Sequence, residues 1–193
     1  GAMDDAALVG QATILFAASY ETQANSMTWA LFLLAQHPAI AAALVDELRG
    51  ECNGNPPSVE QLDRLPLLDA VVKESMRILP TVPYTIRAVT KPTELGGVPL
   101  DVEDRVLCSH YVTHHMPEIY PNPERFDPAR WETIKPSPSE YLPFGAGPRT
   151  CLGSSLAQGI IKMAIAKILP KWKLDVVPHT VLDRHMAISL GPC

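Results

Sequence analysis

Cys151 lies in a glycine-rich loop near the C-terminal end of the sequence, Phe144-Gly145-Ala146-Gly147-Pro148-Arg149-Thr150-Cys151-Leu152-Gly153. Glycines at 145 and 147 allow a tight turn and let the backbone approach a flat ligand closely. The N-terminus of a helix expected after Cys151 favours an anionic sulfur, and Arg149 adds positive charge where an anionic group could dock. The pattern predicts a thiolate. The alternative is a packed structural cysteine beside a turn, because free cysteines are among the most buried residues.

A second candidate site is the segment Ala17-Ala18-Ser19-Tyr20-Glu21-Thr22, whose polar residues interrupt a long apolar stretch. On a helix, Ala18, Glu21, Thr22 and Asn25 share one face, so a small residue lies one turn from an acid and an alcohol. A flat cofactor could lie against the small residues while the hydroxyl and the carboxylate handle protons. The alternative is a helix with an ordinary solvated polar face.

The loop spacing F-G-x-G-x-R-x-C-x-G resembles the cysteine-loop signature of the cytochrome P450 family. The resemblance implies that haem b is bound, with Cys151 as the proximal iron ligand, and that O2 is the co-substrate. A thiolate ligand pushes electron density onto the iron and favours O–O cleavage. The other cofactor-binding residues implied by the resemblance are Ala18, Arg87, Phe144, Gly145, Gly147, Arg149 and Gly153.

The stretch at Ala18 is similar to the family pattern [AG]-G-x-[DE]-T-[TS]. It departs from that pattern at Ser19, which replaces glycine, and at Gln23, which replaces Thr or Ser. The resemblance makes Thr22 the residue that steadies dioxygen and Glu21 the residue that helps to deliver protons. It also assigns Arg87 and Arg149 to the two haem propionates, which suits two guanidiniums facing two carboxylates.

Two further segments resemble structural motifs of the family: Glu74-Ser75-Met76-Arg77, an E-x-x-R helix, and Pro123-Glu124-Arg125-Phe126, a P-E-R-F segment. The resemblance implies a buried network of Glu74, Arg77 and Arg125 that holds proline-rich coil against the helices. His114 matches a histidine that supports the fold. We expect these residues to be structural rather than catalytic.

The spacing of apolar residues and breakers predicts mostly helix with a few strands. Expected helices are 5–36, which at 1.5 Å per residue is about 45 Å long, 40–48, a short helix starting at Ser58, 66–79 and 152–169. Expected strands are 84–90, 106–111, 173–177 and 186–190, the first two being joined through Gly96-Gly97. Of the 19 prolines, 12 lie between Pro80 and Pro148, which predicts short edge strands and coil there.

Composition narrows the class of protein further. The 193 residues carry a net charge of −5 and no basic run, so nucleic acid is an improbable partner. Four widely spaced cysteines, without a C-x-x-C pair, argue against a zinc cluster or disulfide framework and favour the cytoplasm. No stretch is long enough to predict a membrane span. Residues 1–3 resemble a scar left by tag removal.

Together these patterns predict a mainly α protein with small β elements, in which residues 4–193 form the C-terminal half of the cytochrome P450 fold, trimmed at both ends. The function implied by the resemblance is a haem-thiolate monooxygenase that oxidises a small apolar organic substrate with electrons from a ferredoxin or reductase. Residues 82–86 are expected to line the pocket, and Lys135, Lys162 and Lys167 to offer the electron donor a basic patch. Two alternatives stay open: a haem-free scaffold that self-associates as a homodimer, and a P450-type peroxygenase or isomerase.

Overall fold

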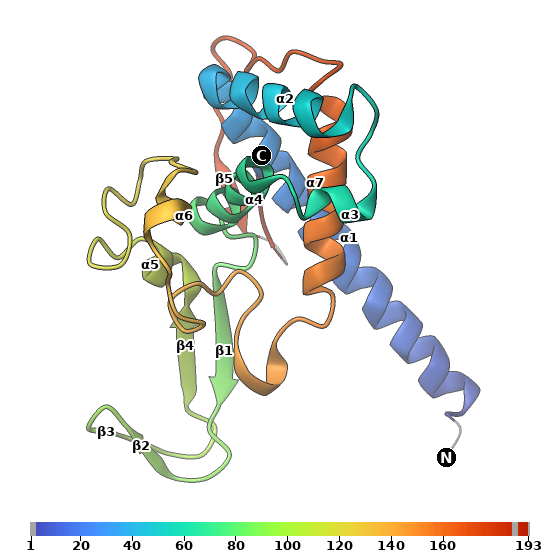
Figure 1. Ribbon diagram of the computed structural model, residues 1–193. Coiled ribbons are helices and arrows are strands. Elements are labelled where there is room, and N and C mark those ends of the chain that lie inside the picture. The colour runs from blue at the N-terminus through green and yellow to red at the C-terminus, as the bar shows by residue number, and fades with distance from the viewer. Residues whose placement is uncertain (1–2, 187–188, 193) are drawn as a thin grey trace.

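The computed structural model describes residues 3–186 and 189–192 of the chain. The longer helices pack into one body, two of the three strand pairs lie to one side, the third packs against α1, and the N-terminal end of α1 extends away from the body (Figure 1). The helices are α1 (Asp5–Gln36), α2 (Pro38–Cys52), α3 (Val59–Leu62), α4 (Pro66–Ile78), α5 (His110–His114), α6 (Arg130–Thr133) and α7 (Ser154–Ile168), with a 3-10 turn at Gly147–Arg149. The fold is therefore mainly α, as the sequence predicts.

Local sequence signals explain where the helices begin and end. Asp4 caps α1 by accepting a hydrogen bond from the Ala7 amide at 2.8 Å. Pro38 and Pro66 occupy first-turn positions of α2 and α4, where a missing N–H costs nothing. Ser58 forms the predicted capping box at the start of α3. The predicted helix boundaries are close to the observed ones, except that α2 extends to Cys52.

The hydrophobic core lies where the second half of α1 meets α2, α4 and α7. Leu34, Leu44, Leu68 and Ile165, one from each helix, are all 0% exposed. The first half of α1 is different, because its residues 5–20 are exposed throughout. Among the described residues no single helix has the length and hydropathy of a membrane span; α1 and α2 would qualify only together, and they meet at 109°.

Three antiparallel strand pairs complete the fold: β1 (Tyr84–Ala88) with β4 (Arg105–Ser109), β2 (Thr93–Leu95) with β3 (Val98–Leu100), and β5 (Arg184–Met186) with β6 (Leu190–Pro192). Gly96 and Gly97 turn the β2–β3 hairpin with φ of 58° and 81°, a region that glycine adopts readily. This hairpin is inserted between β1 and β4 and projects from the body (Figure 1).

Two strand predictions need correction. The segment 173–177 is not a strand, since it is extended coil without a ladder partner in the described part of the chain. Its β-branched residues lie largely on the surface, so packing does not favour a sheet there. The segment 186–190 is also not one strand: Met186 ends β5, Leu190 begins β6, and residues 187–188 between them lie outside the described residues.

A buried ionic network holds the proline-rich segment against α4, but one of its members differs from the prediction. Arg77 binds Glu74 through two nitrogens at 2.9 and 3.0 Å, as expected. The second guanidinium on Glu74 is that of Arg130, at 2.8 Å. Arg125 is exposed and contributes its carbonyl oxygen, which accepts from Arg77 and Arg130. The expected Glu74–Arg77–Arg125 side-chain network was therefore wrong in its third member.

The network continues to the segment that precedes the cysteine loop. His114, 0% exposed, accepts a hydrogen bond from the Leu142 amide at 2.8 Å. The Tyr141 hydroxyl donates to the carbonyl of Lys73 on α4 at 3.1 Å. Residues 141–142 are thus fixed to the helical body, and the cysteine loop begins two residues later.

Candidate functional site

The cysteine loop forms a closed turn at the start of α7. Gly145 and Gly147 have φ of 70° and 75°, so both positions use a conformation that side-chain-bearing residues rarely adopt. The Cys151 amide donates to the Phe144 carbonyl at 2.9 Å, which closes the loop. Gly153 is the N-cap of α7, and a Cβ at this residue would lie 3.9 Å from the Cys151 sulfur. The Cys151 side chain is exposed rather than packed, so the structural-cysteine alternative does not describe it.

A cavity of about 920 Å³ lies between this loop and the middle of α1. Its walls are mostly apolar and come from α1, the start of β1, the end of β4, the cysteine loop and the first turns of α7. Eight of the predicted site residues line it: Ala18, Thr22, Arg87, Phe144, Gly145, Arg149, Cys151 and Gly153. Segments more than 100 positions apart therefore meet around one space, as the thiolate interpretation requires.

The cavity face of α1 carries small and hydroxyl residues at four-residue intervals. Ala18, Thr22 and Ser26 all line the cavity. The Thr22 hydroxyl donates to the Ala18 carbonyl at 2.7 Å, so this alcohol bonds to its own helix beside the cavity. The Ser19 hydroxyl likewise donates to the Phe16 carbonyl, at 3.2 Å.

Glu21 does not share that face, and neither Glu21 nor Gly147 is among the cavity-lining residues. The Glu21 carboxylate accepts hydrogen bonds from the hydroxyl of Ser189 at 2.8 Å and from its amide at 3.2 Å. Asn25 also contacts Ser189. The expectation that Ala18, Glu21, Thr22 and Asn25 act as one face is corrected: the first and third line the cavity, and the other two contact the C-terminal segment.

Two guanidiniums from different elements border the cavity. Arg87 comes from β1 and Arg149 from the end of the 3-10 turn, and both are exposed. Among the described residues, neither lies within 4 Å of a carboxylate oxygen. Two cations without a protein counter-charge at one cavity suit a ligand that carries anionic groups.

Cys108 of β4 and His110, the first residue of α5, are among the cavity-lining residues that sequence reasoning missed. The His110 side chain is buried, with Nδ1 3.0 Å from the Val82 carbonyl. Burial lowers the pKa of His110, and the nearby Arg87 lowers it further. The adjoining prediction for residues 82–86 holds in part, since Val82 and Thr85 line the cavity. The alternating direction of side chains along β4 was the sequence feature that could have predicted that Cys108 lines the cavity.

The basic patch predicted from Lys135, Lys162 and Lys167 loses Lys162 to an ion pair inside the fold. The Lys162 ammonium lies 2.6 Å from Asp69, and its side chain is 12% exposed. Lys73 binds the other oxygen of the same carboxylate at 2.6 Å. Two ammonium groups hold the pKa of Asp69 below its ordinary value even though burial opposes them. Lys162 therefore joins α7 to α4 and is not a free surface cation.

Comparison with known families decides what this cavity belongs to. The family model described as Cytochrome P450 matches residues 1–190. The chain belongs to the cytochrome P450 family. Membership in that family implies a thiolate-bound haem and the use of O2. The described residues of this P450 chain fit that group: the exposed Cys151 thiol of the cysteine loop, two guanidiniums without a carboxylate partner and a small-residue helix face border the same cavity.

Curated relatives of this P450 chain include enzymes named as a hydroxylase and a monooxygenase. Cyclooctatin synthase of Streptomyces melanosporofaciens is 36% identical over 197 residues, which is 100% of this chain and 43% of the relative. Human mitochondrial 25-hydroxyvitamin D-1 alpha hydroxylase is 37% identical, over 95% of this chain and 39% of the relative. Cyclooctat-9-en-7-ol 5-monooxygenase of the same Streptomyces is 34% identical, over 93% and 40%. The chain spans about two fifths of the length of these relatives.

Proposed function

We propose that this chain supplies the thiolate side and part of the oxygen-binding side of a P450 monooxygenase site. The observation that carries the proposal is the shared cavity: Cys151 borders it from the cysteine loop, and Ala18 and Thr22 border it from α1. Haem held by a cysteine thiolate supplies the activation of O2 for the insertion of one oxygen atom into an organic substrate.

In this proposal each cavity residue has a separate task. Cys151 is the iron ligand, and Arg87 and Arg149 bind the two propionates. Ala18 keeps the α1 wall low enough for a flat ring to approach. Gly145 and Gly153 leave the sulfur side of the cavity uncrowded, because neither places a side chain there. The remaining predicted residues, Phe144 and Gly147, shape the loop that presents the sulfur.

The proposed proton-handling residues are Thr22 and Glu21. The Thr22 hydroxyl borders the cavity, where it can hold dioxygen or water by a hydrogen bond. Glu21 precedes Thr22 on the neighbouring face of the same turn, where its carboxylate accepts from Ser189, and is the proposed proton source. The pair favours O2-dependent oxygenation over a peroxygenase or isomerase reaction, since the latter two do not need O2-coupled proton delivery.

The walls and the relatives suggest the substrate class. Apolar side chains such as Ile14, Leu15 and Leu142 line the cavity, which favours a carbon-rich substrate with few polar groups. The reported relatives are named for cyclooctatin, a vitamin D derivative and cyclooctat-9-en-7-ol. We propose a small apolar organic substrate, a ferredoxin or reductase as electron donor, and the cytoplasm as location, although some relatives are mitochondrial by name.

A second candidate is a haem-free scaffold that self-associates, and one observation favours it. The first half of α1 exposes several large apolar side chains: Leu8, Val9, Ile14, Leu15, Phe16 and Tyr20. Exposed apolar surface of this kind commonly marks an interface. In that case the cavity would be a gap closed by a second copy, and haem would not be taken up.

Absorption spectroscopy tests the proposal. The whole protein that contains this chain, reduced under carbon monoxide, should show the red-shifted Soret band of thiolate-ligated haem. Cys151→Ser should abolish that band. Cys108→Ser is the matched control, because Cys108 is a second exposed thiol on the same cavity, and it should retain the band. A well-folded protein without the band, or a band that survives Cys151→Ser, contradicts the proposal.

Haem titration with size-exclusion chromatography separates the scaffold candidate. One haem per monomer supports the monooxygenase site. A haem-free dimer at the same concentration supports the scaffold.

A further inference from the structure

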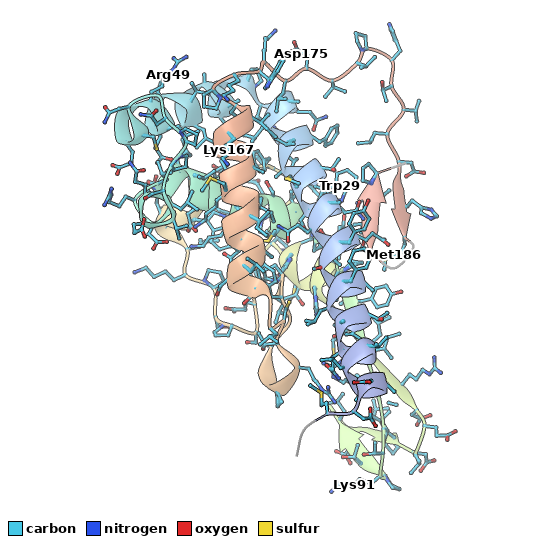
Figure 2. The ribbon with its side chains drawn as sticks, turned by 90° about the vertical axis from the view of Figure 1, so that its right-hand side faces the viewer. Trp29, Arg49, Lys91, Lys167, Asp175 and Met186 are labelled. Atoms are coloured by element: carbon cyan, nitrogen blue, oxygen red, sulfur yellow. The ribbon has the colours of Figure 1, made fainter. Side chains whose placement is uncertain are left out.

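The middle of α1 presents a second functional face, directed at the C-terminal segment rather than at the cavity. Glu21, Asn25 and Trp29 follow one another at four-residue intervals, so they lie on one side of the helix. All three contact residues 189–191. Figure 2 shows β5 and β6 beside the middle of α1, at the level of Trp29. We call residues 189–191 the C-terminal clamp.

Ser189 is the centre of this contact. Ser189 is 1% exposed. Its hydroxyl and its backbone amide both donate to the same carboxylate oxygen of Glu21, at 2.8 Å and 3.2 Å. The Asn25 side-chain amide donates to the Ser189 hydroxyl oxygen at 2.7 Å. Since that oxygen accepts from Asn25, its own hydrogen is directed to Glu21. The three side chains form one chain of hydrogen bonds with a defined direction.

The clamp is held in place independently of the Ser189 hydroxyl. Trp29 donates from its indole nitrogen to the Leu190 carbonyl at 2.9 Å, and the Leu190 amide donates to the Thr81 carbonyl at 2.8 Å. Gly191 lies against Asn25 so closely that a Cβ would meet the Asn25 amide at 2.8 Å. Removing the hydroxyl should therefore change the Glu21 contact without releasing the segment.

We propose that Ser189 is a positioning residue for Glu21, with Asn25 setting the direction of its hydroxyl. The inference rests on the proposed function, in which Glu21 supplies protons beside Thr22. Two donors fix the carboxylate in one rotamer, on the helical turn that also carries Thr22. With one donor left, the carboxylate turns between rotamers and lies less often in the position from which it passes protons towards Thr22, the neighbour that borders the cavity. O2 that has taken up two electrons from the proposed electron donor then leaves with two protons as hydrogen peroxide, instead of giving one oxygen atom to the product and the other to water.

The test compares three variants of the whole, haem-loaded protein: Ser189→Ala, Glu21→Gln, and both together. The readout is the fraction of reducing equivalents recovered as hydrogen peroxide. Ser189→Ala should raise that fraction several-fold, with the carbon monoxide spectrum and the substrate dissociation constant unchanged. Ser137→Ala, a serine in an exposed turn, is the matched control and should equal the parent protein.

The double variant distinguishes positioning from a general structural role. If Ser189 acts through Glu21, adding Ser189→Ala to Glu21→Gln gives no further rise in peroxide, because the two changes remove the same effect. An equal fold-rise in both backgrounds overturns the proposal. So does a Ser189→Ala variant with the parent peroxide fraction.

A second measurement does not depend on haem. Amide hydrogen exchange at Ser189 should accelerate in Glu21→Ala, which removes the acceptor, and should change much less in Glu21→Gln, whose amide oxygen still accepts. Unchanged exchange in Glu21→Ala contradicts the positioning contact. A missing thiolate spectrum would instead sink the proposed function and leave this exchange result intact.

Discussion

The Glu74 carboxylate is the most heavily bonded acid among the described residues. Its two oxygens accept from Arg77, Arg130, the Trp131 indole and the Asp127 amide, all within 3.0 Å. The carboxylate and the Arg77 side chain are 0% exposed. Such a site has little tolerance for losing one partner, because a buried charge without compensation is costly.

Arg130→Met should therefore destabilise the fold by about 3 kcal/mol, since it leaves a buried carboxylate with one guanidinium fewer. Arg125→Met is the matched control: its side chain is exposed, and the carbonyl that the network uses is unaffected. We expect a loss below about 0.5 kcal/mol for the control. Urea unfolding of the two variants measures the difference, and equal losses would show that the Arg125 side chain is part of the network.

The sequence pointed to Arg125 because its P-E-R-F motif matches the family pattern. The chain repeats the spacing five residues later, as Pro128-Ala129-Arg130-Trp131, and the structure uses that second arginine. The repeat was visible in the sequence, but the choice between the two required knowing which arginine reaches α4. The partner of Glu21, by contrast, could not be read from the sequence. Ser189 lies 168 positions away, and no local pattern indicates that the two residues meet.

His114 predicts a pH dependence of stability. Burial is the main cause that lowers its pKa to about 3, and its Nε2 accepts from the Leu142 amide, which requires the neutral ring. The unfolded chain binds a proton near pH 6.5, whereas the folded chain does not. This contribution to stability is thus complete above pH 6.5 and is lost as pH falls from 6.5 towards 3, by about 1.4 kcal/mol per pH unit.

His114→Gln is the variant that tests this, because the amide oxygen of glutamine can still accept from Leu142. Between pH 7.5 and 5.5 the parent protein should lose about 1.4 kcal/mol more stability than the variant. The free energy of unfolding in urea at the two pH values supplies the comparison. Parallel losses in parent and variant would assign the acid sensitivity to other groups.

At the scale of elements, the ends of helices that are marked by proline could be predicted from the sequence, whereas the pairing partners of strands could not. Pro38, Pro66 and Pro80 fix the ends of α1, α4 and their neighbours by removing donors and restricting the preceding residue. The wrong strand at 173–177 had suitable residues but no partner within hydrogen-bonding reach in the described structure. Strand formation depends on such long-range pairing, which local sequence does not report.

The start of α4 shows the same dependence on a distant partner. Leu65 is its N-cap and offers no side-chain cap, but Glu47 of α2 accepts from the amides of Leu67 and Leu68 at 2.7 and 3.0 Å. A carboxylate there satisfies two orphan donors and lies at the positive end of the helix dipole.

Glu47→Ala should therefore cost about 1–2 kcal/mol and accelerate amide exchange at Leu67 and Leu68. The neighbouring Asp46→Ala removes an acid whose side chain is 80% exposed and should cost almost nothing. Thermal unfolding with exchange mass spectrometry compares the two. A cost for Asp46→Ala as large as that for Glu47→Ala would attribute the effect to net charge rather than to capping.

At the scale of the whole molecule, packing is distributed unevenly along α1. Its second half buries Trp29, Ala30, Leu33 and Leu34, whereas its first half is exposed on every side. Both halves are comparably apolar, so the sequence predicts one continuous helix without showing which part is packed. The contrast arises from tertiary contacts with α2, α4, α7 and β6, which all involve the second half.

The same substitution at two positions of α1 measures this contrast. Leu34→Ala removes a side chain that is 0% exposed in the core, and we expect a loss of about 2–5 kcal/mol from lost burial and the remaining cavity. Leu15→Ala removes a side chain that is 62% exposed, so its cost should stay below about 0.5 kcal/mol. Helix propensity changes equally in both variants, which leaves packing as the difference.

Urea unfolding of the 193-residue chain at several protein concentrations is the measurement. Leu15→Ala could instead cost as much as Leu34→Ala, with a cost that grows with protein concentration. A second copy of the chain would then cover the first half of α1 in solution. That result would support the scaffold candidate, which the packing of a single copy does not support.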